Sequence, residues 1–233
     1  MEEKEKIMIR TIKFKGQPLN LAGRNIKEGA AAPDFAVTAQ DLTQVKLSDF
    51  KDKIKVLTSF PSIDTPVCDL QVKEFNKRAT QLSQEVVILG ISKDLPFAQK
   101  RFCETFDIKN VKVLSDYKNA SFGINYGLLI RELNLLARSV IIVDKSNYIR
   151  YIQVVEELTI PPDFEAALKK LEEVAKNPFS AGEKQELPGH CKPCEGGTPP
   201  MPKEKIEKLL SQYRGWEVIE YKKMVKEFKF RDF

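Results

Sequence analysis

Four cysteines are the residues of this chain whose type and spacing suggest chemistry. Cys68 and Cys103 stand alone, whereas Cys191 and Cys194 form a C-x-x-C pair. In a cytoplasmic chain, cysteines indicate redox or metal chemistry rather than a static framework of disulfides. The only histidine, His190, excludes any mechanism that needs a His–His pair or a Cys–His pair elsewhere. The two isolated cysteines are therefore the first candidates for catalysis.

Cys68 has a setting that suits a reactive thiolate. The thiolate is the nucleophile of cysteine chemistry, and a free thiol with a pKa of about 8.5 supplies little of it at neutral pH. A helix N-terminus favours a negative charge. Apolar residues at helical spacing predict a helix over 69–82, directly after Cys68. We therefore expect backbone N–H groups to point towards the Cys68 sulfur.

Three other residues are candidates for the same pocket. Arg138, at the start of a predicted strand, can supply a fixed positive charge and N–H donors for the oxygens of a substrate. Thr65, three residues before Cys68, has a hydroxyl that can donate to the sulfur or orient a substrate. Pro61 ends the preceding strand, because proline cannot donate to a sheet ladder, and it shields one side of the pocket.

The segment Pro61–Cys68 resembles the P-x-x-x-T-x-x-C active-site signature of peroxiredoxins. Its Ser, Asp, Thr and Pro residues are similar to those of the bacterial thiol peroxidase subfamily. Ala32–Phe35, Lys100–Cys103 and Ala137–Val140 extend the resemblance, which covers about residues 7–175. It implies a thioredoxin-like layered α/β fold with an N-terminal β-hairpin.

The resemblance also implies how the cysteines work. Cys68 would attack hydrogen peroxide or an organic hydroperoxide, with Pro61, Thr65 and Arg138 completing its pocket. Cys103 would resolve the product as an intrachain disulfide, and a thioredoxin-like protein would reduce that disulfide. The chemistry agrees, because a sulfenic acid is overoxidised unless a second thiol condenses with it. The same resemblance implies a homodimer and an enzyme with neither cofactor nor metal.

The elements that position these residues alternate between strands and helices, which predicts a layered α/β domain with a central mixed sheet. A hairpin over 7–22 turns at Lys15-Gly16-Gln17. Pro161 and Pro162 are expected to open the last helix of the domain, which ends near residue 176. The other expected strands are 35–38, 54–60, 85–91, 111–115, 139–144 and 148–154, with a further helix over 96–106.

The sequence predicts three parts. Residues 1–177 form the thiol peroxidase domain, 178–189 a linker, and 190–233 a small α+β appendage. The appendage is expected to contain a helix around 206–213 and strands over 216–219 and 224–230. It resembles the front part of pterin-4a-carbinolamine dehydratases but lacks the downstream segment that carries their catalytic histidines, so dehydratase activity is not expected.

The C-x-x-C pair of Cys191 and Cys194 leaves three interpretations open. Two thiolates are half of the four ligands that a structural zinc site needs. A dithiol can also relay electrons, here to a Cys68–Cys103 disulfide. The third interpretation is a partial fold that is used for docking or oligomer contact, or that is only a remnant.

Composition excludes several function classes. The net charge of +5 is spread along the chain, so the chain lacks the basic stripe that would indicate nucleic-acid binding. The apolar runs are too short to cross a bilayer, and the charged N-terminus has no apolar signal core, which predicts a cytoplasmic protein.

Two other functions are alternatives to a peroxidase. A thioredoxin-like disulfide oxidoreductase would need a second cysteine at position 65 or 71. If the chain were instead a binding module carried by the tail, the Cys68 pocket would have to be broken. The residues expected in that pocket are all present.

Overall fold

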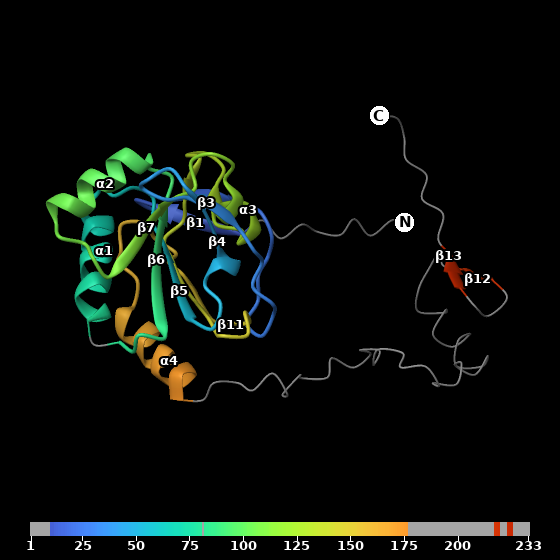
Figure 1. Cartoon of the computed structure of the whole chain (residues 1–233). Helices are drawn as coiled ribbons and strands as arrows, with labels where there is room; N and C mark the ends of the chain where they lie inside the picture. The colour runs from blue at the N-terminus through green and yellow to red at the C-terminus, as the bar shows by residue number, and fades with distance from the viewer. Residues whose placement is uncertain (1–9, 81, 177–216, 220–222, 226–233) are drawn as a thin grey trace. The chain divides into compact units, whose positions relative to one another are not determined.

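The computed structural model describes residues 10–80, 82–176, 217–219 and 223–225. The chain divides into two units, residues 1–183 and 184–233, and each is considered by itself (Figure 1).

A seven-stranded mixed sheet forms the centre of the first unit, which confirms the predicted layered α/β class. Its three middle strands pair in parallel, and every pairing outside them is antiparallel. In sheet order the strands are β11 (Ile149–Val154), β10 (Ser139–Val143), β5 (Ile54–Ser59), β6 (Val86–Ser92), β7 (Val111–Ser115), β3 (Ala36–Thr38) and β4 (Gln44–Lys46).

Successive side chains of a strand point to opposite faces of the sheet, and both faces are covered here. Val56 of β5 packs with one hydrophobic cluster and its neighbour Leu57 with the other. Figure 1 shows three helices gathered on one side: α1 (Pro66–Ala79), α2 (Pro96–Thr105) and α4 (Phe164–Lys176). The other face carries the helix α3 (Ser121–Asn125) and a second sheet of β1 (Thr11–Phe14), β2 (Gln17–Ala22), β8 (Leu129–Ile130) and β9 (Leu135–Leu136).

The N-terminal hairpin of β1 and β2 is confirmed, with a tighter turn than expected. Phe14 pairs with Gln17, so only Lys15 and Gly16 form the loop. Both have positive φ, 50° and 79°, as a two-residue turn of the type that matches the strand twist requires.

Two helix starts differ from the sequence prediction. The first helix begins at Pro66 rather than near residue 69, because proline suits the first helical position. The last helix begins at Phe164, after Pro161 and Pro162. Asp163 acts as its N-cap: the Ala166 amide donates to Asp163 Oδ1 at 2.9 Å. The prolines therefore lead into the cap instead of opening the helix.

Several short elements were not predicted from the sequence: β4, β8, β9, α3 and a 3-10 turn over Leu47–Asp49. Two to five residues are too few to show a periodicity, so only tertiary contacts define these elements.

In the second unit, β12 (Glu217–Ile219) pairs antiparallel with β13 (Lys223–Val225), and Val218 lies opposite Met224. These strands overlap the two that the sequence predicts there. The helix expected around 206–213 lies outside the described residues, and the three-part division of the chain stays a prediction. Among the residues that the structure describes, no helix is long and apolar enough to cross a membrane.

Candidate active site

Cys68 lies within the first turn of α1, just beyond the carboxyl end of β5. Thr65 is the N-cap residue, with extended backbone angles of φ −106° and ψ 142°, and Pro66 opens the helix. Pro61 is buried in the turn between β5 and the cap. Cys68 is 0% exposed, whereas Thr65 is at the surface, so the sulfur lies below the residues that face solvent.

The Thr65 hydroxyl contacts the Cys68 sulfur. Its Oγ1 donates to Sγ at 2.7 Å and lies 3.1 Å from the Ser62 carbonyl, and one hydroxyl proton serves one of these acceptors at a time. The expected backbone contacts to the sulfur are replaced: the amides of Cys68 and Asp69 both donate to the Thr65 carbonyl. The positive end of the helix dipole still lies at the sulfur.

Arg138 approaches the same sulfur from the other side. Its Nη2 donates to Cys68 Sγ at 3.4 Å and to the Leu158 carbonyl at 2.8 Å. Nε also lies 3.3 Å from the Leu158 carbonyl, and Nη1 donates to Gln71 Oε1 at 2.6 Å. The guanidinium is therefore held on two sides with one N–H directed at the sulfur.

The burial of Arg138 has an electrostatic consequence. The side chain is 1% exposed, and within residues 10–80 and 82–176 it forms no ion pair with a carboxylate. An uncompensated buried charge costs several kcal/mol. The ionisable group that the guanidinium contacts is the Cys68 thiol, so the guanidinium is placed to compensate a negative charge on this sulfur or on an oxygen beside it.

Sheet pairing explains how residues 70 positions apart meet. Ser139, the first residue of β10, lies opposite Ser59, the last residue of β5. Arg138 directly precedes Ser139, and the turn leading to Cys68 directly follows Ser59. Both are thereby placed at the same end of these two paired strands.

Two residues of the site were not predicted from the sequence. Gln71, fully buried one turn after Cys68, accepts from Arg138 and donates to Thr58 Oγ1 at 2.6 Å. Its position three residues after Cys68, on the same helix face, was the available signal. Asp94 accepts from Ser62 Oγ at 2.7 Å and from the Ile63 amide at 2.9 Å, which holds the turn before Thr65. No local sequence pattern indicates that contact.

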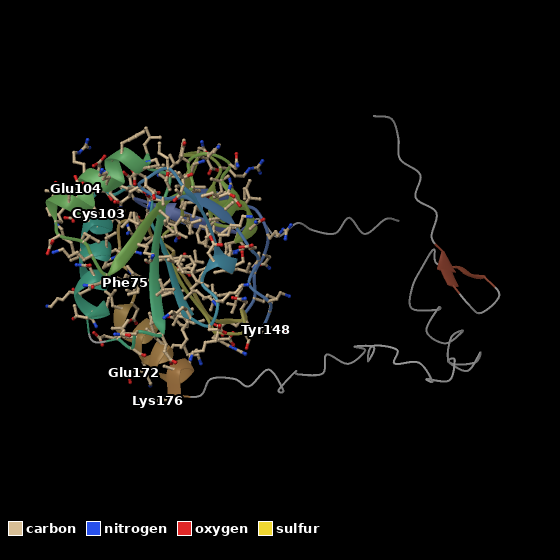
Figure 2. All side chains as sticks on the ribbon, in the orientation of Figure 1. Phe75, Cys103, Glu104, Tyr148, Glu172 and Lys176 are labelled. Carbon is tan, nitrogen blue, oxygen red and sulfur yellow. The ribbon has the colours of Figure 1, made fainter. Side chains whose placement is uncertain are left out.

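Cys103 lies on α2, in the same hydrophobic cluster as Cys68 (Figure 2). It is 8% exposed, and the side-chain amide of Gln40 donates to its sulfur at 3.1 Å. Burial raises the pKa of the Cys103 thiol, the Gln40 hydrogen bond opposes that rise, and the negative charge of Glu104 adds to it. Cys103 is therefore protonated at neutral pH.

The structure does not join the two cysteines: both thiols are free. Arg138, which contacts the first sulfur, precedes β10, and Gln40, which contacts the second, follows β3. Four strand spacings separate β10 from β3, about 19 Å across the sheet. A disulfide needs Cα atoms within about 7 Å. A bond between the two sulfurs would join thiols that now rest with different partners, Arg138 and Gln40.

The burial of Cys103 predicts slow alkylation in the folded chain. At neutral pH, iodoacetamide is expected to modify it at least about tenfold more slowly than in concentrated urea, because the covered thiol is protonated. The rate should keep rising with pH beyond the range in which an exposed thiol levels off. Peptide mapping by mass spectrometry in a Cys68→Ser chain measures this residue separately, and equal rates in both conditions would contradict the burial.

Among the described residues, no group of three or more His, Cys, Asp or Glu side chains could hold a metal ion. His190, Cys191 and Cys194 lie outside those residues. The zinc, relay and docking interpretations of the tail, and its resemblance to pterin-4a-carbinolamine dehydratases, therefore stay predictions.

Comparison with known sequences gives a consistent set of relatives. The sequence profile of the redoxin family matches residues 27–168. The thiol peroxidase of Staphylococcus epidermidis is 49% identical over 158 residues, which cover 68% of this chain and 95% of that protein. The thiol peroxidase of Oceanobacillus iheyensis is 48% identical over 160 residues, 69% of this chain and 97% of that protein.

Solved structures agree with these sequences. A peroxiredoxin-like protein from Aquifex aeolicus superposes with a TM-score of 0.67 at 39% identity, over 71% of this chain and 97% of that one. A thiol peroxidase from Chromobacterium violaceum gives a TM-score of 0.64 at 20% identity, over 72% and 98% of the two chains, and shows the shared fold alone.

Proposed function

The chain belongs to the redoxin family and, within it, to the thiol peroxidases, and we propose that it reduces hydroperoxides through Cys68. Its fold is the thioredoxin-like fold of peroxiredoxins, as the sequence predicts, and it is a peroxidase. The identity of the reacting cysteine, the resolving step and the reductant belong to the proposal.

One observation carries the assignment of Cys68: two donors from different parts of the chain converge on its sulfur. The Thr65 hydroxyl lies 2.7 Å away and the Arg138 guanidinium 3.4 Å away. A thiolate between two such donors is stabilised before substrate arrives. The same donors can then follow the negative charge as it moves onto the peroxide oxygens in the transition state.

The first step transfers one oxygen atom. The Cys68 thiolate attacks one peroxide oxygen, the O–O bond breaks, and the other oxygen leaves as alkoxide or hydroxide and takes up a proton. Cys68 becomes a sulfenic acid, and the substrate is reduced to an alcohol or to water. Arg138 stabilises the charge on the departing oxygen, and Thr65 orients the attacked one.

The second step needs a thiol, and we assign it to Cys103. The Cys103 thiol loses its proton, its sulfur attacks the Cys68 sulfenic sulfur, an S–S bond forms as the S–O bond breaks, and the hydroxide that leaves takes up a proton to become water. Because the two sulfurs rest with different partners, Arg138 and Gln40, we expect α2 or the first turn of α1 to open locally. Openings of this kind are ordinary events of low free energy in folded proteins. A dithiol protein of the thioredoxin class would then reduce the disulfide by exchange.

A Cys103→Ser variant tests the resolving assignment. With one equivalent of peroxide and no reductant, it is expected to oxidise Cys68 to the sulfenic acid at a rate within about threefold of the parent, because Gln40 and not Cys68 is the hydrogen-bond partner of Cys103. Steady-state turnover with thioredoxin and thioredoxin reductase should fall to background, since no intrachain disulfide forms. Stopped-flow kinetics and coupled NADPH consumption measure the two steps, with hydrogen peroxide and with an alkyl hydroperoxide.

The matched control is the Cys191→Ser/Cys194→Ser chain, which removes two thiols but keeps Cys103. Thioredoxin-supported turnover should persist in it. Undiminished cycling of Cys103→Ser would contradict the resolving role of Cys103, and loss of cycling in the control would instead favour the dithiol relay of the tail. The proposed cytoplasmic location and homodimer are independent of this outcome.

A further inference from the structure

The turn of the N-terminal hairpin forms an anion-binding site that an acidic side chain of the same chain occupies. Lys15 and Gly16 both have positive φ, which directs their consecutive amides to one side. These amides donate to Glu157 Oε1 and Oε2, each at 3.0 Å. Consecutive backbone N–H groups in such a turn are a recognised cradle for a carboxylate.

The carboxylate in this turn is charged throughout the working pH range. The hydrogen bond from the Gly16 amide is the largest cause that lowers the pKa of Glu157, to about 2, with further bonds from Thr159 and Lys15. Thr159 donates through its amide at 3.1 Å and through its hydroxyl at 2.9 Å.

Glu157 belongs to a short segment, residues 155–159, that follows β11 and that we call the strap. Strand β1 holds the strap on both sides of Glu157. The Lys13 amide donates to the Glu156 carbonyl at 2.6 Å, and the Leu158 amide donates to the Lys13 carbonyl at 2.9 Å.

The strap in turn holds Arg138. The Val155 amide donates to the Arg138 carbonyl at 2.9 Å, and the Leu158 carbonyl accepts from both Nε and Nη2 of the guanidinium. The same Nη2 donates to Cys68 Sγ. Leu158 follows Glu157 directly in the chain. One residue along the chain thus separates the anchored Glu157 from the carbonyl that accepts from the guanidinium.

We propose that Glu157 is a positioning residue for peroxide reduction: by anchoring the strap in the hairpin turn, it fixes the Leu158 carbonyl and so the direction of the Arg138 guanidinium. This inference rests on the proposed role of Arg138 at Cys68. The contact to the sulfur is 3.4 Å long, so a small rotation of the guanidinium breaks it. Displacements of about 1 Å in reacting geometry can slow catalysis by up to about a hundredfold.

The chain offers a matched control on the same hairpin. Glu132 accepts from the Asn20 amide through both carboxylate oxygens, at 3.1 and 3.0 Å, and from Asn20 Nδ2 at 2.6 Å. It therefore holds β2 much as Glu157 holds the β1–β2 turn, and these hydrogen bonds to Asn20 do not involve the strap. A variant of Glu132 loosens the hairpin without acting on Leu158.

The test measures the second-order rate of Cys68 oxidation in the full chain by stopped flow. Glu157→Ala is expected to lower it about tenfold and Glu157→Gln, which keeps an acceptor oxygen, about threefold. Glu132→Ala should leave the rate unchanged. Glu157→Ala should add nothing in an Arg138→Ala background, because both changes act through one guanidinium.

Three outcomes overturn the inference: an unchanged rate in Glu157→Ala, an equal loss in Glu132→Ala, or multiplicative losses in the double variant. If Glu157→Ala does not fold, Glu157→Gln and its double variant carry the same comparison. Failure of the proposed function has a different signature, because peroxide would then leave Cys68 unoxidised in the parent chain itself. If only the role of Arg138 fails, Cys68 is oxidised in Arg138→Ala as fast as in the parent.

Discussion

Replacing Cys68 by serine is expected to abolish peroxide reduction, with a loss of at least about a thousandfold in the rate of peroxide consumption. Serine is nearly the same size and keeps a partner for the Thr65 hydroxyl, so the fully buried site should stay folded. A serine hydroxyl is not ionised at neutral pH, however, and Arg138 cannot make it a nucleophile comparable with a thiolate.

Single-turnover peroxide consumption measures the effect most directly, because it does not depend on any reductant. Cys103→Ser is the matched control, since it removes a buried thiol elsewhere in the same hydrophobic cluster and should keep the first turnover. A Cys68→Ser chain that still consumed one equivalent of peroxide would move the peroxidatic role to another cysteine.

The second large effect is expected at Arg138. Arg138→Ala should slow Cys68 oxidation by about a hundredfold or more, because it removes the charge that favours the thiolate and a donor for the leaving oxygen. It should also destabilise the fold, since Gln71 Oε1 and the Leu158 carbonyl lose their charged donor. Each unsatisfied buried acceptor costs about 1–3 kcal/mol.

Arg138→Lys separates charge from geometry. An ammonium keeps the charge but cannot reach Gln71, Leu158 and the sulfur together, so an intermediate loss is expected. Arg78→Ala is a suitable control: Arg78 lies on the same helix as Cys68 and pairs with Glu74 and Glu165. Stopped-flow oxidation gives the rate and urea unfolding the stability. An Arg138→Ala rate within about threefold of the Arg78→Ala rate would remove Arg138 from the mechanism.

Much of the site could be predicted because its core is local in sequence. Thr65, Pro66 and Cys68 belong to the cap and first turn of one helix, so short-range preferences for a cap and for proline at the helix start define this part of the site. The same local reasoning went wrong at Pro161 and Pro162, where the Asp163 cap decided the helix start. It also assigned backbone amides to the sulfur that donate to Thr65 instead.

The sequence by itself determined the layered α/β class, the N-terminal hairpin and the Cys68 motif, because each depends on periodicity or on residues a few positions apart. The family resemblance also named Arg138 as a member of the Cys68 pocket. Only the tertiary structure decided how its guanidinium contacts the sulfur, that Gln71 and the strap hold that guanidinium, and that Cys103 rests with Gln40. Those contacts depend on the pairing of β5 with β10 and on the seating of the hairpin, which join segments about 70 to 140 positions apart. Pairing over such separations is set by the whole core, and no short stretch of sequence encodes it.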